Sequence, residues 1–364
     1  MKVLKSRFVM LLLLSFSHLG FATGVPSSSL CSGLFGVHTL ERLLHPESLL
    51  EKGTFVTLPQ SGQELYVKYN QPKDGKPTLV LLNGLTYDTE NWNTFAKYFI
   101  EEGYGLVRYD MHGMGETLKR EGSIQDLIPW EKQVEDLKQL LEVLRVPPPY
   151  NIAGLSYGGA ISFGFHRTYP HLVKNHISMA PFVAPEPKQD GYIKFMIAGT
   201  KVNPFARLNP FLNGKTDDEL YDFFFKTTIL PTYPAVEPDA QKNYPQKLDA
   251  IYQLVRGVRK YLPMNMGHFL QGKGKVHLMI GLKDEYIPTE QHLTYWDGIS
   301  AGNKGSVIRL ANTKHKVPED IPYFASRWVM EILDGNSLLA DGVSFDGYPH
   351  ANIARSLRGE ISFR

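Results

Sequence analysis

The chain has 364 residues, of which 43% are hydrophobic and 21% charged, with 39 Lys and Arg against 37 Asp and Glu. This balance is that of an ordinary soluble globular protein and excludes a disordered chain or a membrane transporter. No basic run indicates a nucleic-acid partner. The single cysteine, Cys31, excludes an internal disulfide and a cysteine-based metal cluster. Because the histidines form no HExxH or HxH pattern, we expect no metal and no cofactor.

Residues 1–22 have the order of an export signal, in which a basic start precedes the apolar run Phe8–Leu14 and small residues follow up to Ala22. A membrane anchor is the alternative, but a span needs roughly 20 apolar residues, and this stretch is shorter and contains serine and histidine. We therefore expect a signal peptide over residues 1–22, no stable membrane span, and a bacterial protein that is periplasmic or secreted.

From residue 55 onward, strand patterns alternate with helical patterns. Two alternating runs, 55–58 and 64–69, flank Ser61-Gly62 and predict a hairpin. The continuous apolar run at 77–82 predicts a strand that is buried on both faces. Further strands are predicted at 105–110, 150–153, 176–180, 275–280 and 306–310. Helices are predicted at 92–102, around 134–144, at 159–169 and around 290–296. This order indicates the α/β class, with a mostly parallel sheet that has helices on both faces.

Two segments depart from this alternation. Residues 183–265 are rich in Phe, Tyr and Pro and contain helical patterns without buried strands, so we predict a helical cap inserted between two strands. Within it, Thr216-Asp-Asp-Glu219 predicts a capping box at the start of a helix. Residues 336–364 have neither a helical nor a strand period, and we predict a flexible or loosely docked extension.

A candidate nucleophile lies at the turn between a predicted strand and a predicted helix. Residues 154–158 read Gly-Leu-Ser-Tyr-Gly, a G-x-S-x-G pattern. Its glycines let the chain turn sharply and leave Ser156 exposed at the carboxyl edge of the sheet. The following helix N-terminus favours negative charge beside it. A serine in an ordinary glycine-rich turn is the alternative, and the strand–turn–helix context favours the nucleophile.

A serine hydroxyl needs a base, and that base needs an acid that orients it. In the expected chain order, Asp or Glu follows the serine, and His comes last. Asp284 follows the predicted strand 275–280, and His315 follows the strand 306–310, at the same edge of the sheet. We predict Ser156, Asp284 and His315 to be catalytic, with Glu285 as the alternative acid. Three other histidines are expected on a helix or strand face: His166, His171 and His176.

The negative charge that develops during acyl transfer needs two N–H donors. The backbone N–H of Tyr157, directly after the nucleophile, is one candidate. In the loop after strand 77–82, Gly84 permits a tight turn, and the N–H of Leu85 is the second candidate. Phe195 and Phe224 of the cap are predicted to bind substrate, with clustering into the cap's own core as the alternative for such aromatics.

Together these motifs resemble the α/β-hydrolase fold family, in its serine-nucleophile branch. The matching segments keep the family's order over about 230 residues. They are Asn83-Gly84-Leu85, Tyr109–Gly115, Gly154–Gly159, Gly281–Asp284 and His315. The resemblance implies an α/β-hydrolase core made of residues 23–182 and 266–335, the inserted cap, and the triad named above. It also assigns 110–115 to a structural turn. One departure is Asn83-Gly84, where many members have His-Gly.

Three functions are compatible with these features. The first is a serine hydrolase that cleaves a carboxylic ester of a small acyl substrate through an acyl-enzyme. The second uses the same triad for amide or peptide cleavage, carbon–carbon bond hydrolysis or acyl transfer, because such folds host many reactions. The third is a non-catalytic binding protein. Ester hydrolysis is the preferred interpretation, and the oligomeric state is left open.

Overall fold

The computed structural model describes residues 52–236 and 246–347. The predicted signal peptide and the end of the C-terminal extension lie outside the described residues. Within the described ranges, no helix combines the length and the hydropathy that a bilayer span requires.

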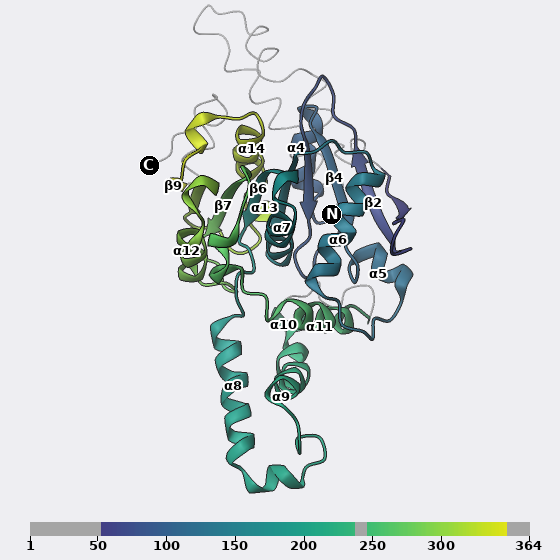
Figure 1. Ribbon diagram of the computed structural model, residues 1–364, viewed down its shortest axis with the longest axis vertical. Helices are drawn as coiled ribbons and strands as arrows, with labels where there is room; N and C mark the ends of the chain where they lie inside the picture. Colours follow the sequence, from purple (N-terminus) through teal and green to yellow (C-terminus); the bar gives the residue numbers. More distant parts are fainter. Residues whose placement is uncertain (1–51, 237–245, 348–364) are drawn as a thin grey trace, which may run out of the picture. The chain divides into compact units, whose positions relative to one another are not determined.

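A nine-stranded sheet forms the centre of the described residues, in the order β1-β2-β4-β3-β5-β6-β7-β8-β9 (Figure 1). The β1–β2 hairpin and the β2–β4 pair are antiparallel, and every pair from β4–β3 to β8–β9 is parallel. The predicted hairpin and the mostly parallel α/β sheet are both confirmed. The strands are β1 Thr54–Thr57, β2 Glu64–Asn70, β3 Thr78–Leu82, β4 Gly105–Asp110, β5 Tyr150–Leu155, β6 Val173–Met179, β7 Lys275–Gly281, β8 Lys304–Leu310 and β9 Val343–Gly347.

Helices cover both faces of this sheet. Helices α4 and α14 pack against each other on one face, where the rings of Tyr98 and Tyr323 lie 5.3 Å apart. Helices α6 and α7 pack together on the other face. The helices of the sheet domain are α4 Asn93–Glu101, α5 Gly115–Glu121, α6 Trp130–Val143, α7 Tyr157–Thr168, α12 Thr289–Gly298, α13 Val317–Asp320 and α14 Pro322–Leu333.

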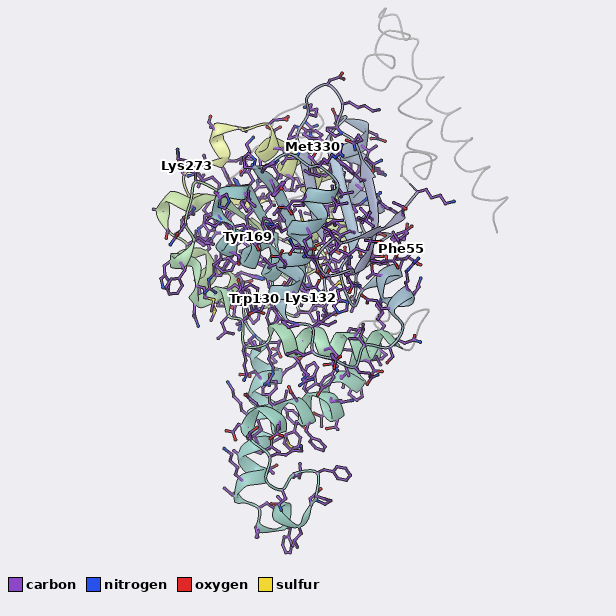
Figure 2. All side chains as sticks on the ribbon, turned by 45° about the vertical axis from the view of Figure 1, so that its right-hand side comes forward. Phe55, Trp130, Lys132, Tyr169, Lys273 and Met330 are labelled. Atoms are coloured by element: carbon purple, nitrogen blue, oxygen red, sulfur yellow. The ribbon has the colours of Figure 1, made fainter. Side chains whose placement is uncertain are left out.

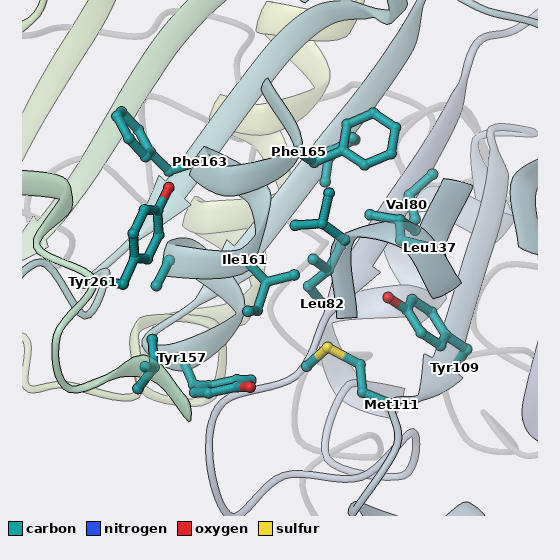
Figure 3. Close-up of a cluster of buried hydrophobic side chains, with 14 of the residues drawn as sticks. Val80, Leu82, Tyr109, Met111, Leu137, Tyr157, Ile161, Phe163, Phe165 and Tyr261 are labelled. Carbon is teal, nitrogen blue, oxygen red and sulfur yellow. The ribbon is translucent and has the colours of Figure 1, made fainter. Parts of the chain in front are cut away.

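The main core lies between the sheet and the layer that contains α6 and α7 (Figure 3). Val80 and Leu82 of β3 point into it and pack with Leu137 of α6 and Ile161 of α7. The residue between them, Leu81, is also fully buried. Because successive side chains of a strand point to opposite faces, this continuous burial requires apolar layers on both sides of the sheet.

The segment predicted as a cap contains α8 Pro187–Val202, α9 Asp217–Phe224, α10 Tyr233–Val236 and α11 Gln246–Val258. The predicted capping box is confirmed, because the Glu219 N–H donates to Thr216 Oγ1 at 3.3 Å and the Thr216 N–H donates to Glu219 Oε2 at 2.8 Å. Helices α8 and α9 extend away from the sheet, beyond α10 and α11 (Figure 1). Ile193, Leu220 and Phe224 belong to a separate small core between them.

The beginning of the C-terminal extension differs from the prediction. Residues 343–347 form β9, which pairs in parallel with β8 from Ser306↔Val343 to Leu310↔Gly347. Beside this ladder, Arg309 Nε lies 2.8 Å from Asp346 Oδ1. The strand lies at the sheet edge and buries few side chains, so it has no apolar alternation. Backbone pairing with β8 creates it, and a hydrophobicity pattern cannot reveal such pairing.

Two of the three histidines expected to decorate a face are instead buried. His166 of α7 and His176 of β6 have no exposed surface, whereas His171 is exposed. Burial lowers the pKa of His166 to about 4 and that of His176 well below its ordinary value. Both side chains are therefore neutral parts of the packed interior at physiological pH.

Candidate active site

Ser156 stands alone between a strand and a helix in a strained backbone conformation. Strand β5 ends at Leu155, α7 begins at Tyr157, and Ser156 between them has φ 51° and ψ −114°. A non-glycine residue in such a conformation costs about 1–3 kcal/mol and must be held by its surroundings. The Ser156 N–H donates to Met179 O at 3.0 Å, and its carbonyl accepts the N–H of Phe182 at 2.8 Å. The turn is thus tied to the end of the neighbouring strand β6.

The glycines of the pentapeptide allow backbones to approach closely. A Cβ atom at Gly154 would lie 2.2 Å from the Gly158 carbonyl oxygen, and one at Gly158 would lie 2.3 Å from the Leu82 carbonyl oxygen. Both distances are shorter than any stable contact, so only glycine fits at these positions. The first turn of α7 can therefore lie directly against β3 and β5, which leaves the serine at the edge of the sheet.

The predicted acid and base meet across two loops at the same edge. His315 Nδ1 lies 2.7 Å from Asp284 Oδ2. The other carboxylate oxygen, Oδ1, accepts the N–H groups of Tyr286 at 2.8 Å and Ile287 at 2.9 Å. Glu285, the alternative acid, instead has a half-exposed side chain near Lys314. The structure therefore brings Asp284, and not its neighbour, to the histidine.

The environment of Asp284 favours its ionised form. Burial of this side chain raises its pKa, but the hydrogen bond and charge of His315 and the two backbone N–H donors outweigh burial and hold the pKa below its ordinary value. The ring of Tyr286 meets the His315 ring edge-on, with centroids 5.0 Å apart. The His315 imidazole is therefore positioned by its hydrogen bond to the Asp284 carboxylate and by its edge-on contact with the Tyr286 ring.

A single pocket joins Ser156 and His315 with both candidate oxyanion donors, Leu85 and Tyr157. The sheet domain forms its floor and the cap forms its roof. Apolar and aromatic residues of the cap segment dominate that roof, and polar groups enter from Glu186, Gln189 and Arg259. The roof residues are Tyr221, Phe225, Tyr233, Val255 and Val258. A concave apolar pocket with a few polar groups is the usual form of a small-molecule site.

The two phenylalanines predicted to bind substrate lie away from this pocket. Phe195 is 72% exposed on α8, and Phe224 packs inside the small core of the cap. Tyr221 and Phe225, four residues apart, line the pocket instead. Residues at this spacing share a helix face, and Phe224 lies about 100° away from Phe225 around the helix. The i, i+4 spacing of Tyr221 and Phe225 therefore indicates that they share one helix face. The rotation of the helix in the folded protein decides that this face lines the pocket.

Asn83 supports the loop that carries the Leu85 amide. Its Oδ1 accepts the indole N–H of Trp92 at 2.7 Å, and its Nδ2 donates to Tyr109 O at 3.1 Å and to Asp110 Oδ1 at 3.3 Å. The side chain is fully buried with both ends bonded. Asparagine thus fixes this loop in the place where many members of the family have histidine.

Asp110 anchors the segment that was assigned to a structural turn. Its Oδ1 accepts the Thr89 N–H at 2.7 Å and its Oδ2 accepts the Glu116 N–H at 2.8 Å. Burial raises the pKa of Asp110 to about 7, with these donors acting in the opposite direction. The carboxyl group therefore joins the loop after β3 to the start of α5.

Comparisons with known proteins agree with this architecture. A model of the family described as serine aminopeptidase, S33 matches residues 73–250. An α/β hydrolase enzyme from a Medee basin deep-sea metagenome library aligns over 78% of this chain and 98% of its own, with a TM-score of 0.56 and 18% identity. The chain has the α/β-hydrolase fold.

Two further solved α/β-hydrolase neighbours cover most of the chain. A membrane phospholipase A, described as a bacterial virulence factor, covers 92% of this chain and 99% of its own, with a TM-score of 0.55 and 20% identity. A thermophilic esterase from Thermogutta terrifontis covers 78% of this chain and 98% of its own, with a TM-score of 0.54 and 16% identity. At these identities the likeness concerns the fold alone.

Curated relatives of this α/β-hydrolase match only part of it. A 2-hydroxy-6-oxononadienedioate/2-hydroxy-6-oxononatrienedioate hydrolase from Paraburkholderia phymatum is 30% identical over 144 residues, which is 38% of this chain and 47% of the relative. An (E)-2-((N-methylformamido)methylene)succinate hydrolase from Acinetobacter baylyi is 32% identical over 108 residues, which is 29% of this chain and 38% of the relative. Each match thus spans less than half the length of the relative.

Proposed function

We propose that this α/β-hydrolase is a serine hydrolase that cleaves a carboxylic ester through an acyl-enzyme intermediate. One observation carries the proposal. Ser156, on its strained turn, lines the same pocket as His315, whose Nδ1 is 2.7 Å from the Asp284 carboxylate. A nucleophile, a base and an orienting acid in this arrangement are the parts that acyl transfer requires.

In the proposed reaction, Ser156 Oγ attacks the ester carbonyl while His315 Nε2 accepts the hydroxyl proton. Asp284 keeps the other ring nitrogen protonated and stabilises the imidazolium that forms. The backbone N–H groups of Leu85 and Tyr157 donate to the tetrahedral oxyanion, each worth about a hundredfold or more in rate. His315 then protonates the departing alcohol, and water attacks the acyl-enzyme by the same steps to release the acid.

The pocket lining supports an acyl substrate, since the roof is built of Tyr, Phe and Val side chains. A second candidate is carbon–carbon bond hydrolysis. The name of the Paraburkholderia relative describes hydrolysis of a keto-dienoate that contains no ester or amide, so that reaction must break a carbon–carbon bond. Amide or peptide cleavage and acyl transfer would use the same three side chains.

A fluorophosphonate probe tests the nucleophile. We expect the wild type and Ser337→Ala to be labelled, because Ser337 is an exposed serine far from the pocket in sequence, and Ser156→Ala to remain unlabelled. Equal labelling of Ser156→Ala and the wild type would remove the nucleophile assignment.

A substrate panel then separates the candidate reactions. It should contain p-nitrophenyl esters of increasing acyl length, aminoacyl p-nitroanilides and a 2-hydroxy-6-keto-dienoate. We expect the highest kcat/KM on an ester. Rapid turnover of the anilide without ester turnover would assign amide cleavage instead. Rapid turnover of the dienoate without ester turnover would assign carbon–carbon bond hydrolysis.

We also propose that the protein is exported, on the strength of the basic–apolar–small order of residues 1–22. The test is fractionation of cells that express the full chain, followed by N-terminal sequencing. A mature protein that starts near residue 23 in the periplasm or medium is expected. Retention of residues 1–22 in the cytosolic fraction would refute export.

A further inference from the structure

The far end of the cap exposes large apolar side chains. Among the described residues, six large apolar side chains are more than 60% exposed, and five of them lie between residues 195 and 211. They are Phe195 (72%), Val202 (83%), Phe205 (74%), Leu208 (78%) and Phe211 (67%). Scattered exposed apolar residues are ordinary, but five of them within 17 residues of sequence indicate an interaction surface. We call residues 202–211 the cap tip.

The cap tip is built from two copies of the same short turn. Asn203-Pro-Phe205 and Asn209-Pro-Phe211 are six residues apart in the sequence. In each copy the asparagine Oδ1 accepts the N–H of the phenylalanine, at 3.0 Å in the first and 2.9 Å in the second. Proline fixes φ between them. The two phenylalanines are therefore held in water by hydrogen-bonded turns and do not fold back onto the cap.

Charge distinguishes this surface from the rest of the cap. From residue 202 to residue 216 the sequence contains Arg207 and Lys215 and no Asp or Glu. The first acidic residue beyond it, Asp217, pairs with Lys201 at 2.6 Å and closes the base of the loop. The segment 202–216 thus carries basic residues and no acid of its own, and Lys215 at its base lies 4.0 Å from Glu219 Oε1. This excess of basic residues beside the exposed apolar group favours a negatively charged partner.

The position of the cap tip favours a flat and extended partner. The tip joins α8 to α9 at the end that lies away from the sheet, where its side chains point outward (Figure 2). A stable protein–protein contact buries about 1,200–2,000 Å². A loop of ten residues offers only a small part of that area. A lipid bilayer, in contrast, accepts a narrow apolar projection that enters the boundary between headgroups and acyl chains.

We propose that the cap tip docks on the surface of a lipid bilayer that contains anionic headgroups. Phe205, Leu208 and Phe211 enter the acyl boundary, and the excess of basic residues over acidic ones in the segment 202–216 favours anionic phosphates. The two helices that bear the tip also reach the pocket, through Gln189 of α8 and Tyr221 of α9. Docking therefore fixes the pocket at a set distance from the membrane. This inference concerns binding and stands whichever bond the pocket cleaves.

The emission of an environment-sensitive fluorophore attached to the cap tip reports whether the tip itself contacts lipid. The full chain is prepared as Cys31→Ser, so that a single introduced cysteine takes an environment-sensitive nitrobenzoxadiazole label. Leu208→Cys places the label on the tip. Lys73→Cys places it on an exposed turn that precedes β3, at the opposite edge of the sheet. The labelled proteins are titrated with vesicles of phosphatidylcholine and phosphatidylglycerol in equal parts, and with vesicles of phosphatidylcholine alone.

We expect the label at position 208 to shift its emission to shorter wavelength with the mixed vesicles, and the label at position 73 to stay unchanged. Binding to the neutral vesicles should be weaker by about tenfold or more, because the segment 202–216 contains two basic residues and no acid. With Phe205→Ser and Phe211→Ser added, half-saturation should require more lipid, by about tenfold or more for each phenylalanine. Leu338→Ser, which removes an equally exposed apolar side chain outside the cap, should change nothing.

Three outcomes would overturn the proposal. The first is an unchanged spectrum at position 208 with both vesicles. The second is an equal response at positions 208 and 73, which would mean unspecific adsorption or membrane contact through another part of the chain. The third is a response at position 208 that follows protein concentration without lipid, which would assign the tip to a second copy of the chain.

Discussion

The indole N–H of Trp92 donates a hydrogen bond to Asn83 Oδ1 at 2.7 Å, so a helix-preceding residue holds the loop that presents the Leu85 amide. Both side chains are fully buried. The asparagine amide also bonds to the end of β4, through Tyr109 O and Asp110 Oδ1. The Asn83 side chain thus connects three segments. Replacing it would affect the reaction by moving the loop that carries the Leu85 N–H.

Replacing Asn83 by alanine should lower the free energy of unfolding by about 1–3 kcal/mol, because the Trp92 N–H then lacks its acceptor in the interior. We also expect a lower kcat on an ester, since the Leu85 donor loses its support. Denaturant unfolding and steady-state kinetics measure the two effects. Trp92→Phe is the companion variant, because it removes the donor and keeps a ring. If the two losses of stability simply add in the double variant, the proposed coupling is wrong.

Asp284→Asn tests the orienting acid. We expect kcat to fall by about 10⁴, because an amide in place of the carboxylate favours the wrong tautomer of His315. Folding should be little affected, since Asn can still accept the two backbone N–H groups. Glu285→Gln is the matched control next to it, and it should keep kcat within about twofold because that side chain is half-exposed. Comparable losses in the two variants would show that the acid has been misassigned.

Two glycine-to-alanine variants compare a glycine that packs against neighbouring backbone with a glycine that has open space around it. Gly158→Ala should destabilise the fold by about 3 kcal/mol or more and abolish activity, because its Cβ would lie 2.3 Å from the Leu82 carbonyl oxygen. Gly199→Ala in α8 meets nothing within 4 Å, and it should stabilise the protein by about 0.5–1 kcal/mol. Thermal unfolding and fluorophosphonate labelling compare the two variants. A stable and active Gly158→Ala protein would contradict the packing described for the turn.

Buried neutral histidines should make the fold sensitive to acid. Burial lowers the pKa of His277 to about 3, and its Nδ1 accepts the N–H of Ser306 at 3.2 Å, a bond that a protonated ring cannot form. His166 and His292, also buried, have a pKa lowered to about 4. In the unfolded chain a histidine binds a proton near pH 6.5. Between that pH and the folded pKa, the unfolded state therefore binds more protons, and stability falls as pH falls.

Denaturant unfolding between pH 7.5 and pH 5 measures this slope, above the range in which most carboxylates titrate. Asp110, whose pKa burial raises to about 7, takes up its proton in the folded state within this window and contributes with the opposite sign, so the histidine share is read from the difference between a histidine variant and the wild type. Each such histidine contributes up to about 1.4 kcal/mol per pH unit in the lower part of that window. His277→Gln should reduce the slope of the free energy of unfolding against pH by the contribution of one histidine. This holds even if the variant is less stable at every pH. A slope that His277→Gln leaves unchanged would mean that this histidine is not a source of the acid sensitivity.

Much of the architecture was predictable because the signals are local. The apolar run of residues 77–82 is β3, the alternating runs around Ser61-Gly62 form the β1–β2 hairpin, and Thr216 caps α9. Each feature depends on residues that are near one another in the chain. The order of strands and helices then limits the topology, and loops that follow parallel strands share one edge of the sheet. For this reason Ser156, Asp284 and His315 were expected at one edge.

What the sequence by itself determined is therefore the α/β class, the strand ends that carry chemistry, and the turn that isolates Ser156. Only the tertiary structure decided which neighbour of a pair meets the site: Asp284 and not Glu285 reaches His315, and Phe225 and not Phe224 lines the pocket. It also decided that Asn83 bonds to Trp92 and that an edge strand, β9, forms. These outcomes depend on helix rotation, burial and backbone pairing between distant segments, and those are set by the packing of the whole domain, which no local pattern records.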